Sequence, residues 1–440
     1  MAALNLIHFV SDLCIACAGT GCIYLLIAAA AVLRFTRQSA QVNDLAEPVT
    51  ILKPLQGFEP NLGPRLASFC YQDYAAPVQV VCGVHDPSDP AAEEVKRIAK
   101  SASNAADIEL VAAGRMQGYC NRKVSNLANM MGAARHDVLV IADSDIEARP
   151  GYLTRVVSEL RRPGVGAVTC LYHGIAAGGI WSEQAALAIN AHFLPSAVVA
   201  LTFGLAQPCF GSTIALRRST LSSIGGFAPF ADSLADDYAI GMAVRSMGYD
   251  VAVPSFSVGH LCFEESLPAL VSHEVRAART IRSADPAGYA GAFITHPFAL
   301  SLAGVLLGGA NAVLFAAAAL ACRILVCRCV EKAFNVPRQP YWLIPLCDLI
   351  AFSAFIAGFL CKKVTWRGFV YDVSTEGTLQ PEWSESLSEV PGIEPLEGAA
   401  GLFANPPWPA PAYAGLSGAE DGLLQTDMER EEFDFSDRLS

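Results

Sequence analysis

Residues 13 to 33 form an apolar stretch of 21 residues without a charged side chain. As an α-helix, such a stretch would be about 31 Å long, which matches the hydrocarbon thickness of a bilayer. A cleaved signal peptide is the competing interpretation, but its apolar region would be shorter and would follow basic residues. Here Asp12 precedes the stretch, and Arg34 and Arg37 follow it. We therefore predict a transmembrane anchor over residues 1–36.

Two further apolar stretches lie near the other end of the chain. Residues 297 to 322 carry no charge, and residues 341 to 361 are interrupted only by Asp348. They predict transmembrane helices within residues 296–363. The composition agrees, because 16% of the chain is charged, against about 25% in soluble domains. Asp348 could be functional, since charges in lipid are costly, or could make a buried polar contact near the helix end.

The basic residues that flank these stretches predict the orientation. Arg34 and Arg37 follow the first stretch, and Lys362 and Lys363 follow the third. Three crossings from an external N-terminus would place both groups, and the large middle region, on the cytoplasmic side. The connection between the second and third stretches is also basic, so the last two could instead form a re-entrant hairpin.

The net charge of −12 is concentrated at the C-terminal end. Residues 377–440 hold 13 acidic and 2 basic residues, together with 7 prolines. A segment of this composition buries too little surface to offset chain ordering, so we predict a disordered acidic tail. The other residues are nearly neutral at −1, which gives no sign of a nucleic-acid partner. The 14 cysteines show no metal-type spacing and are expected to be reduced.

Residues 46–290 alternate short apolar runs with amphipathic patterns. Apolar runs with helical segments between them predict parallel strands covered by helices, and hence an α/β fold with a doubly wound sheet. The predicted strands are 49–53, 78–84, 108–113, 137–142 and 165–170, and the predicted helices are 91–100, 122–135 and 150–162. Ligands of such sheets bind at the carboxyl ends of the strands.

Carboxylates follow two of these predicted strands. Asp86 comes after the second strand, and Asp143 and Asp145 come after the fourth, in the sequence VLVIADSDI. An Asp-x-Asp turn can bind Mg²⁺ or Mn²⁺ through one carboxylate while the other contacts a sugar or supports the metal, and such an ion neutralises a diphosphate. Turns also use aspartate for purely structural reasons.

Asp236 and Asp237 form a third acidic site at the start of a helical pattern. Acidic residues in a first helical turn can simply stabilise the positive end of the helix. A carboxylate there could also remove the proton from an acceptor hydroxyl while its neighbour orients it. Successive residues point about 100° apart, so only one can face the acceptor, and we assign Asp237 as the base.

Seven motifs, in order and spacing, resemble the ceramide glucosyltransferase-like glycosyltransferases of the family 2/21 type. These are VTILKPLQGFEPNL, VHDPSDP, NRKVSNL, ADSDI, GSTIALRR, LADDYAI and HEVRAARTIR. Within this group the chain is most similar to the hopanoid-biosynthesis-associated glycosyltransferases. The resemblance implies a GT-A nucleotide-sugar domain with a doubly wound mixed sheet, on a membrane anchor, and inverting transfer from a UDP-sugar to a lipid hydroxyl. The hopanoid group implies UDP-N-acetylglucosamine and bacteriohopanetetrol, and the alternative is ceramide with UDP-glucose.

The resemblance also assigns roles to residues. It implies that Asp86 binds the uracil side of the nucleotide, that Asp143 and Asp145 bind the metal and diphosphate, and that Asp237 is the base. Lys53 and Lys123 match positions near the nucleotide, although both could be solvated lysines.

The last motif of the family, Gln-x-x-Arg-Trp, reads His273, Glu274, Val275, Arg276 and Ala277 in this chain. Arg276 is suited to contact phosphate and His273 can donate a hydrogen bond, but Ala277 lacks the aromatic ring. Arg279 and Arg282 could share the phosphate contact or face lipid headgroups. HEVRA lacks the second histidine of a metalloprotease motif.

These observations predict a multi-pass membrane enzyme, in the bacterial inner membrane by resemblance, whose partners are a UDP-sugar and a lipid acceptor. Two other classes stay open. One is a catalytically weakened scaffold, suggested by Ala277. The other is a polysaccharide synthase, for which more spanning helices would be expected.

Overall fold

The computed structural model describes residues 2–37, 45–102, 104–309, 311–366, 369–374 and 377–381. The chain separates into two compact units, Met1–Glu382 and Trp383–Ser440. All of the description below concerns the first unit. The predicted tail beyond residue 381 lies outside the described residues.

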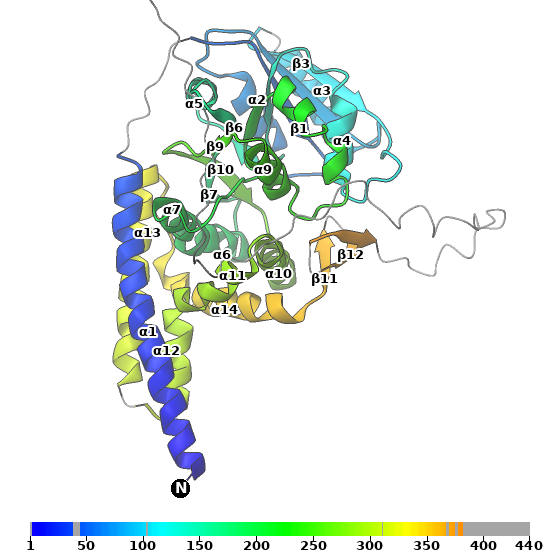
Figure 1. Ribbon diagram of the computed structural model, residues 1–440. Coiled ribbons are helices and arrows are strands. Elements are labelled where there is room, and N and C mark those ends of the chain that lie inside the picture. The colour runs from blue at the N-terminus through cyan, green and yellow to red at the C-terminus, as the bar shows by residue number, and fades with distance from the viewer. Residues whose placement is uncertain are drawn as a thin grey trace, which may run out of the picture. The chain divides into compact units, whose positions relative to one another are not determined.

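A mixed sheet forms the centre of the α/β region (Figure 1). Its seven strands run in the order β3-β2-β1-β4-β8-β6-β9. The first four are mutually parallel, and β8 is antiparallel to both of its neighbours, β4 and β6. This confirms the predicted α/β fold with a mixed sheet. The strands are β1 (Val49–Pro54), β2 (Val78–Val84), β3 (Asp107–Ala112), β4 (Val138–Ile141), β6 (Val165–Thr169), β8 (Ile214–Arg217) and β9 (Asp250–Ala252).

Helices cover both faces of this sheet. Successive residues of β1 show why, because Ile51 belongs to one hydrophobic core and Leu52 to the other. The first core includes α2 (Leu62–Cys70), α3 (Pro90–Ser101) and α5 (Tyr152–Leu160). The second includes α4 (Arg122–Met130), α8 (Arg218–Ser223), η2 (Ala228–Phe230) and α9 (Asp236–Ser246). Such two-sided burial explains the continuous apolar runs of the sequence.

A second, smaller sheet lies between the main sheet and the apolar helices. It consists of β5 (Ile146–Glu147), β10 (Ser257–Cys262) and β7 (Leu171–Ala176). A helical stretch follows β7 and comprises α6 (Ile180–Ala188), the π-helical turn η1 (Ile189–Phe193) and α7 (Leu194–Thr202). This stretch is long and apolar enough to cross a membrane, which the sequence analysis did not predict.

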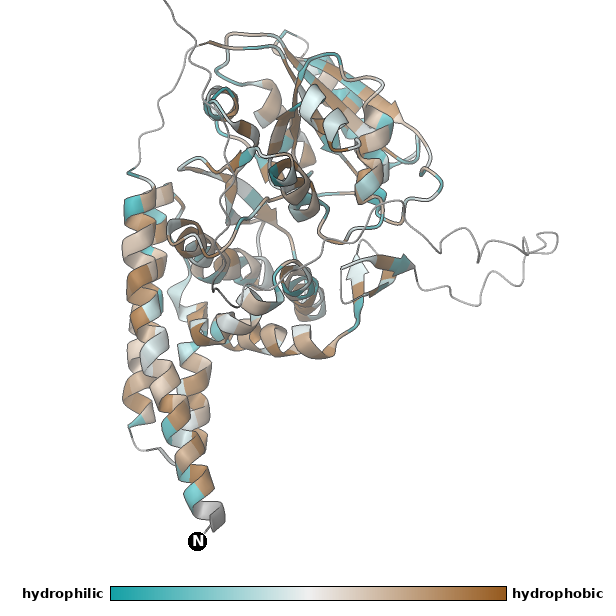
Figure 2. Ribbon diagram, viewed as in Figure 1, coloured by the Kyte–Doolittle hydropathy of each residue, from teal (hydrophilic) through white to brown (hydrophobic). Residues whose placement is uncertain are grey.

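Three apolar helices pack side by side (Figures 1 and 2). They are α1 (Ala2–Phe35), α12 (Pro297–Leu306) and α13 (Ala312–Phe334). The prediction of one helix over 297–322 is therefore wrong, because the chain turns between α12 and α13. Gly308 has a positive φ of 85°, which glycine adopts readily. A Cβ atom at Gly309 would lie 2.5 Å from Oγ of Ser11, so glycine also permits the close approach to α1.

Four single helices in the described residues are long and apolar enough to span a membrane, and the bent pair Pro286–Thr295 and Pro297–Leu306 would make a fifth. The third predicted span corresponds to η4 (Tyr341–Leu343) and α14 (Ile344–Leu360). Figure 1 shows α14 running across the direction of α1 and α13, and it packs on α10 (Leu267–Ala284). The connection from α10 to α12 is formed by α11 (Pro286–Gly291) and η3 (Ala292–Thr295).

Asp348 makes buried polar contacts within these helices. Its Oδ1 lies 2.7 Å from Nε2 of His192 and 3.1 Å from Nε of Arg323. Arg323 also donates to the carbonyl oxygens of Ala191 and Thr295. This arrangement matches the structural interpretation of Asp348, since one carboxylate joins α14 to η1 and α13.

The last described residues form a three-stranded antiparallel sheet, which we call the cap sheet. It consists of β11 (Lys363–Trp366), β12 (Phe369–Val373) and β13 (Leu379–Pro381). Residues 377–381, assigned to the tail from the sequence, therefore belong to folded structure. The charge and proline pattern did not reveal this boundary because the strand is only three residues long.

Candidate active site

The Asp143-Ser144-Asp145 loop follows β4 at the carboxyl edge of the main sheet. Two buried basic side chains donate hydrogen bonds to its main chain. Nζ of Lys53 donates to the carbonyl oxygen of Asp143 at 2.5 Å, and Nε of Arg65 donates to that of Ser144 at 3.0 Å. Glu59 accepts from both the Arg65 guanidinium and the Ser144 hydroxyl. These buried contacts fix the loop in space.

Lys53 is buried, so the alternative of a solvated lysine is wrong for this residue. Its exposed fraction is 0%, and its ammonium lies 4.1 Å from the ring centre of Phe69. Burial lowers the pKa of Lys53 to about 8, against the opposing effect of Asp145. Direct contact with the nucleotide stays a prediction, and it would require Lys53 to leave this position.

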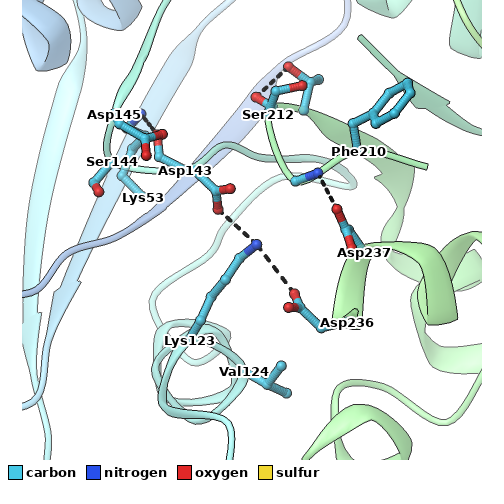
Figure 3. A network of polar contacts seen from close by, with 12 residues as sticks. Lys53, Lys123, Val124, Asp143, Ser144, Asp145, Phe210, Ser212, Asp236 and Asp237 are labelled. Carbon is cyan, nitrogen blue, oxygen red and sulfur yellow. Dashed lines mark hydrogen bonds and ion pairs between the residues drawn. The ribbon is translucent and has the colours of Figure 1, made fainter. Parts of the chain in front are cut away.

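Lys123 lies at the centre of the site, between acids from two elements (Figure 3). Its Nζ is 2.8 Å from Oδ1 of Asp143 and 3.3 Å from Oδ2 of Asp236. Burial alone would lower the pKa of Lys123, but the carboxylates of Asp143, Asp236 and Asp237 raise it above its usual range. Lys123 therefore carries a positive charge within a surplus of negative groups.

The start of α4 places Lys123 in that position. Asn121 caps the helix, because its side-chain oxygen accepts from the backbone N–H of Val124 at 3.1 Å. The Asn121 amide also donates to Asp236 at 3.2 Å and to the carbonyl oxygen of Ser233 at 2.8 Å. One buried asparagine thus connects α4 to the start of α9.

Asp236 and Asp237 occupy different environments. Asp236 is buried, with 4% of its surface exposed, whereas Asp237 is only partly buried. Oδ2 of Asp237 accepts from the backbone N–H of Gly211 at 2.7 Å (Figure 3). Burial and the neighbouring Asp236 carboxylate raise the pKa of Asp237 to about 6, despite the opposing charge of Lys123. Asp237 is therefore the more accessible of the pair, and its environment makes it more basic than an ordinary aspartate.

Gly211 is a site residue that sequence reasoning missed. A Cβ atom there would lie 2.6 Å from Oδ2 of Asp143 and 3.0 Å from Nζ of Lys123. Only glycine allows the segment before β8 to approach the acids so closely. The glycine of the quoted motif GSTIALRR was the available signal.

Asp145 faces a group of aromatic rings. Its Oδ2 lies 3.4 Å from Nε2 of His260, and that ring is 5.3 Å from the ring of Tyr172. Tyr172 in turn stacks on Phe193 at 4.4 Å. Burial alone would lower the pKa of His260, but Asp145 raises it well above its usual value. No pattern in the sequence shows that these rings meet, because they come from β7, η1 and β10.

Asp86 lies at the same edge of the sheet, following β2. Its carboxylate is exposed and accepts from the backbone N–H and the hydroxyl of Ser88, at 2.8 and 2.7 Å. These hydrogen bonds lower the pKa of Asp86. The structure thus brings together Asp143, Lys123, Asp236 and Asp237, while Asp86 stands to one side in a turn.

The predicted residues of α10 face the cap sheet and the second sheet. Nδ1 of His273 is 2.5 Å from Oε1 of Glu264, and the Arg276 guanidinium lies 5.9 Å from the ring centre of Trp366. Arg279 donates to the carbonyl oxygen of Val373 at 3.3 Å, and Arg282 donates to that of Gly358 at 2.9 Å. Arg279 and Arg282 therefore bind main-chain carbonyl groups.

The donor set of Asp143 and Asp145 fits a hard divalent cation, because Mg²⁺ and Mn²⁺ prefer carboxylate oxygen. Among the residues that the structure describes, no group of three or more histidine, cysteine, aspartate or glutamate side chains could hold a metal ion. An ion at this loop would thus need additional oxygen ligands, such as those of a diphosphate.

Several solved structures and curated proteins are similar to this chain. A mannosyltransferase from Pyrobaculum calidifontis, in complex with GDP-mannose and Mn²⁺, has a TM-score of 0.46 and 21% identity, covering 80% of this chain and 99% of that one. Glucosyl-3-phosphoglycerate synthase from Mycobacterium tuberculosis, with Mn²⁺ and UDP-glucose, has a TM-score of 0.33 and 17% identity, covering 54% and 79%.

The curated relatives are ceramide glucosyltransferases. Ceramide glucosyltransferase 1 of Caenorhabditis elegans is 26% identical over 206 residues, which is 47% of this chain and 43% of the relative. The Candida albicans ceramide glucosyltransferase is 31% identical over 127 residues, which is 27% and 23% of the two chains. The chain thus spans less than half the length of these relatives. The sequence model of glycosyl transferase family 21 matches residues 13–379, most of the chain. This chain therefore belongs to glycosyl transferase family 21.

Proposed function

We propose that this protein is a membrane-bound inverting glycosyltransferase that moves a sugar from a UDP-sugar to a lipid alcohol. The observation that carries the proposal is the cluster of Asp143, Asp236 and Asp237 around Lys123, at the edge of a sheet that is joined to apolar helices. The proposed pair is N-acetylglucosamine as the sugar and a bacteriohopanetetrol-type hopanoid as the acceptor. The motif resemblance supports this pair.

Asp237 is the proposed general base. In a direct displacement, the acceptor oxygen forms a bond to the anomeric carbon while the bond from that carbon to the diphosphate oxygen breaks. The acceptor proton passes to Asp237, and UDP leaves. A raised pKa of about 6 makes this carboxylate a better proton acceptor than an ordinary aspartate while leaving it ionised at neutral pH. Asp236, held by Asn121 and Lys123, orients the start of α9.

Asp143 and Asp145 are the proposed ligands of a Mg²⁺ or Mn²⁺ ion. When bound, such an ion neutralises the charge of a diphosphate leaving group. Asp86 is proposed to bind the uracil side of the donor, and His273 and Arg276 to lie near its diphosphate. Excess chelator should abolish transfer, and Asp143→Ala should weaken Mn²⁺ binding measured by calorimetry. Full activity in chelator would contradict the metal role.

Ceramide glucosylation with UDP-glucose is the second candidate, favoured by the names of the curated relatives. The two candidates differ in the lipid and in the substituent at the second carbon of the sugar. In both, the catalytic region is proposed to lie on the cytoplasmic side of its membrane, a bacterial inner membrane in the hopanoid case. The basic residues that follow the first and third apolar stretches support this orientation.

The test is a transfer assay with the purified full chain in detergent. UDP-N-acetylglucosamine and UDP-glucose are each paired with bacteriohopanetetrol and with ceramide, and the products are identified by mass spectrometry. The hopanoid proposal expects an N-acetylhexosamine added to bacteriohopanetetrol, with inversion to a β-linkage from an α-linked donor. A hexose on ceramide would support the second candidate. No product from any pair, with UDP bound, would favour a scaffold.

A further inference from the structure

The hairpin of β11 and β12 contacts two arginines, Arg276 on α10 and Arg122 on α4. The guanidinium carbon of Arg276 lies 5.9 Å from the ring centre of Trp366, and that of Arg122 lies 4.7 Å from the ring centre of Phe369. Trp366 and Phe369 are direct partners across the two strands. One hairpin therefore presents an aromatic ring to each of two cations from different elements, α10 and α4.

The cap sheet is firmly attached around the site. Backbone N–H groups of Leu234 and Leu379 donate to the carbonyl oxygens of Gly377 and Asp232, at 2.9 and 2.7 Å. These bonds join β13 to the segment that leads into Asp236. Leu234 also packs in one apolar cluster with the cap sheet. The cap sheet is thus joined to the segment before α9, and β11 packs on α10.

Both arginines lie beside the residues proposed to bind the donor. Arg122 directly precedes Lys123, and its carbonyl oxygen lies 2.9 Å from Nε2 of His85, the neighbour of Asp86. Its Nε is buried and has no hydrogen-bond partner within the described ranges. A buried donor without a partner is costly, so a ligand oxygen bound at this position would be stabilised by it.

Arg276 acts on the same aromatic ring as two acids of the site. Burial raises the pKa of Tyr172, the carboxylates of Asp237 and Asp145 raise it further, and Arg276 lowers it. Arg276 is therefore within electrostatic range of the Tyr172 hydroxyl, and the His273 ring, one turn earlier on α10, lies 6.4 Å from the ring of His260, the partner of Asp145. Ala277, the neighbour of Arg276, offers no ring, so the aromatic support of this guanidinium comes from Trp366, 90 residues further along the chain.

We propose that the β11–β12 hairpin is a clamp in which Trp366 and Phe369 position the guanidinium groups of Arg276 and Arg122 for the diphosphate of the nucleotide donor. Trp366 and Phe369 are positioning residues, since they act through the arginines. Stacking on a ring limits the orientations of a guanidinium and does not use its N–H groups as hydrogen-bond donors. This inference rests on the proposed UDP-sugar donor.

The test measures UDP binding to the full chain in detergent by calorimetry with Mn²⁺ present, together with donor KM and kcat. Trp366→Leu should weaken UDP binding and raise donor KM by about 3- to 30-fold, the range expected for a lost cation–π contact, with kcat changed less than KM. Trp366→Phe keeps a ring and should restore most of the affinity. Trp342→Leu is the matched control, because Trp342 is 71% exposed on η4.

A double-mutant cycle separates positioning from packing. In an Arg276→Met background, Trp366→Leu should have little further effect on UDP binding, because the group that it positions is absent. The same fold-loss with and without Arg276 would overturn the clamp, as would unchanged UDP affinity in Trp366→Leu. Wild-type protein that binds no UDP would instead overturn the proposed donor, so the two failures are distinguishable.

Discussion

The cluster around Lys123 and the cluster around Arg323 both place a basic side chain beside carboxylates, but they differ in charge balance. Lys123 faces Asp143, Asp236 and Asp237, whereas Arg323 faces Asp348 alone and completes its hydrogen bonds with main-chain carbonyl oxygens. The first cluster keeps a surplus of negative charge at an accessible edge of the sheet. The second is balanced and buried between helices. A surplus can accept a cation or a proton, and a balanced cluster can only hold helices together.

The largest expected effect comes from removing the proposed catalytic base, Asp237, from the cluster around Lys123. Asp237→Asn keeps shape and hydrogen bonding but removes the proposed base, so kcat should fall by roughly 10²- to 10⁴-fold. Asp236→Asn should have a milder effect, because its neighbour still accepts the proton. Steady-state transfer assays measure both variants, and calorimetry should show that Asp237→Asn still binds UDP. Near-normal kcat in Asp237→Asn would contradict the assignment of Asp237 as the general base.

A substitution in the cluster around Arg323 should lower the stability of the protein and change kcat little. Asp348→Ala leaves the buried Arg323 guanidinium without its carboxylate, a change that typically costs about 3–5 kcal/mol. We expect a clear fall in melting temperature in detergent, while the folded fraction keeps its kcat within a few-fold. Asp348→Asn, which can still hydrogen-bond, should lose less. Unchanged melting together with lost transfer would instead give Asp348 a catalytic role.

The pH dependence tests the surplus of charge directly. The pKa of Asp237 is raised to about 6, so transfer should fall about tenfold per pH unit below that value as the base becomes protonated. The raised pKa means that the folded state favours the protonated carboxyl. Stability from this group is therefore present below its usual pKa of 3.8 and is lost as the pH rises through about 6.

Asp237→Asn removes this penalty and should melt at a higher temperature than the wild type at pH 8, with the difference disappearing near pH 4. Initial rates and melting curves across pH measure the two effects. A pH-independent melting difference would show that the carboxylate is not destabilised by its neighbours.

The smallest effect is expected at an ion pair that belongs to neither cluster. Lys96 and Glu93 lie 2.6 Å apart on α3, with side chains 53% and 77% exposed. Water screens such pairs, so Lys96→Ala should leave melting temperature and transfer unchanged within error. A loss comparable to that of Asp348→Ala would mean that burial does not explain the difference between the clusters.

The local pattern of the sequence was enough for the strands of the main sheet and for the acids that follow them. Strands β1 and β2 match the predicted ranges within one residue, and Asp143 and Asp145 leave β4 as expected. Such features depend on residues near each other in the chain, because apolar runs and turn residues act locally. The apolar helix α1 could be predicted for the same reason.

Contacts between distant segments decided the rest. The sequence could not show that a turn at Gly308 and Gly309 divides a continuous apolar stretch, because hydropathy alone does not distinguish one long helix from two packed ones. Nor could it pair Asp348 with Arg323, or bring Gly211 against Asp143, since these residues meet only after the helices and the antiparallel strand β8 have packed.

By itself, the sequence determined which groups are available for chemistry, because carboxylates, lysines and arginines are specified residue by residue. Only the tertiary structure decided which of them meet. It placed Lys123 between Asp143 and Asp236, and it brought Trp366 to Arg276. The physical reason is that charge and stacking energies depend on distances of a few ångströms, and those distances are set by the packing of segments far apart in the chain.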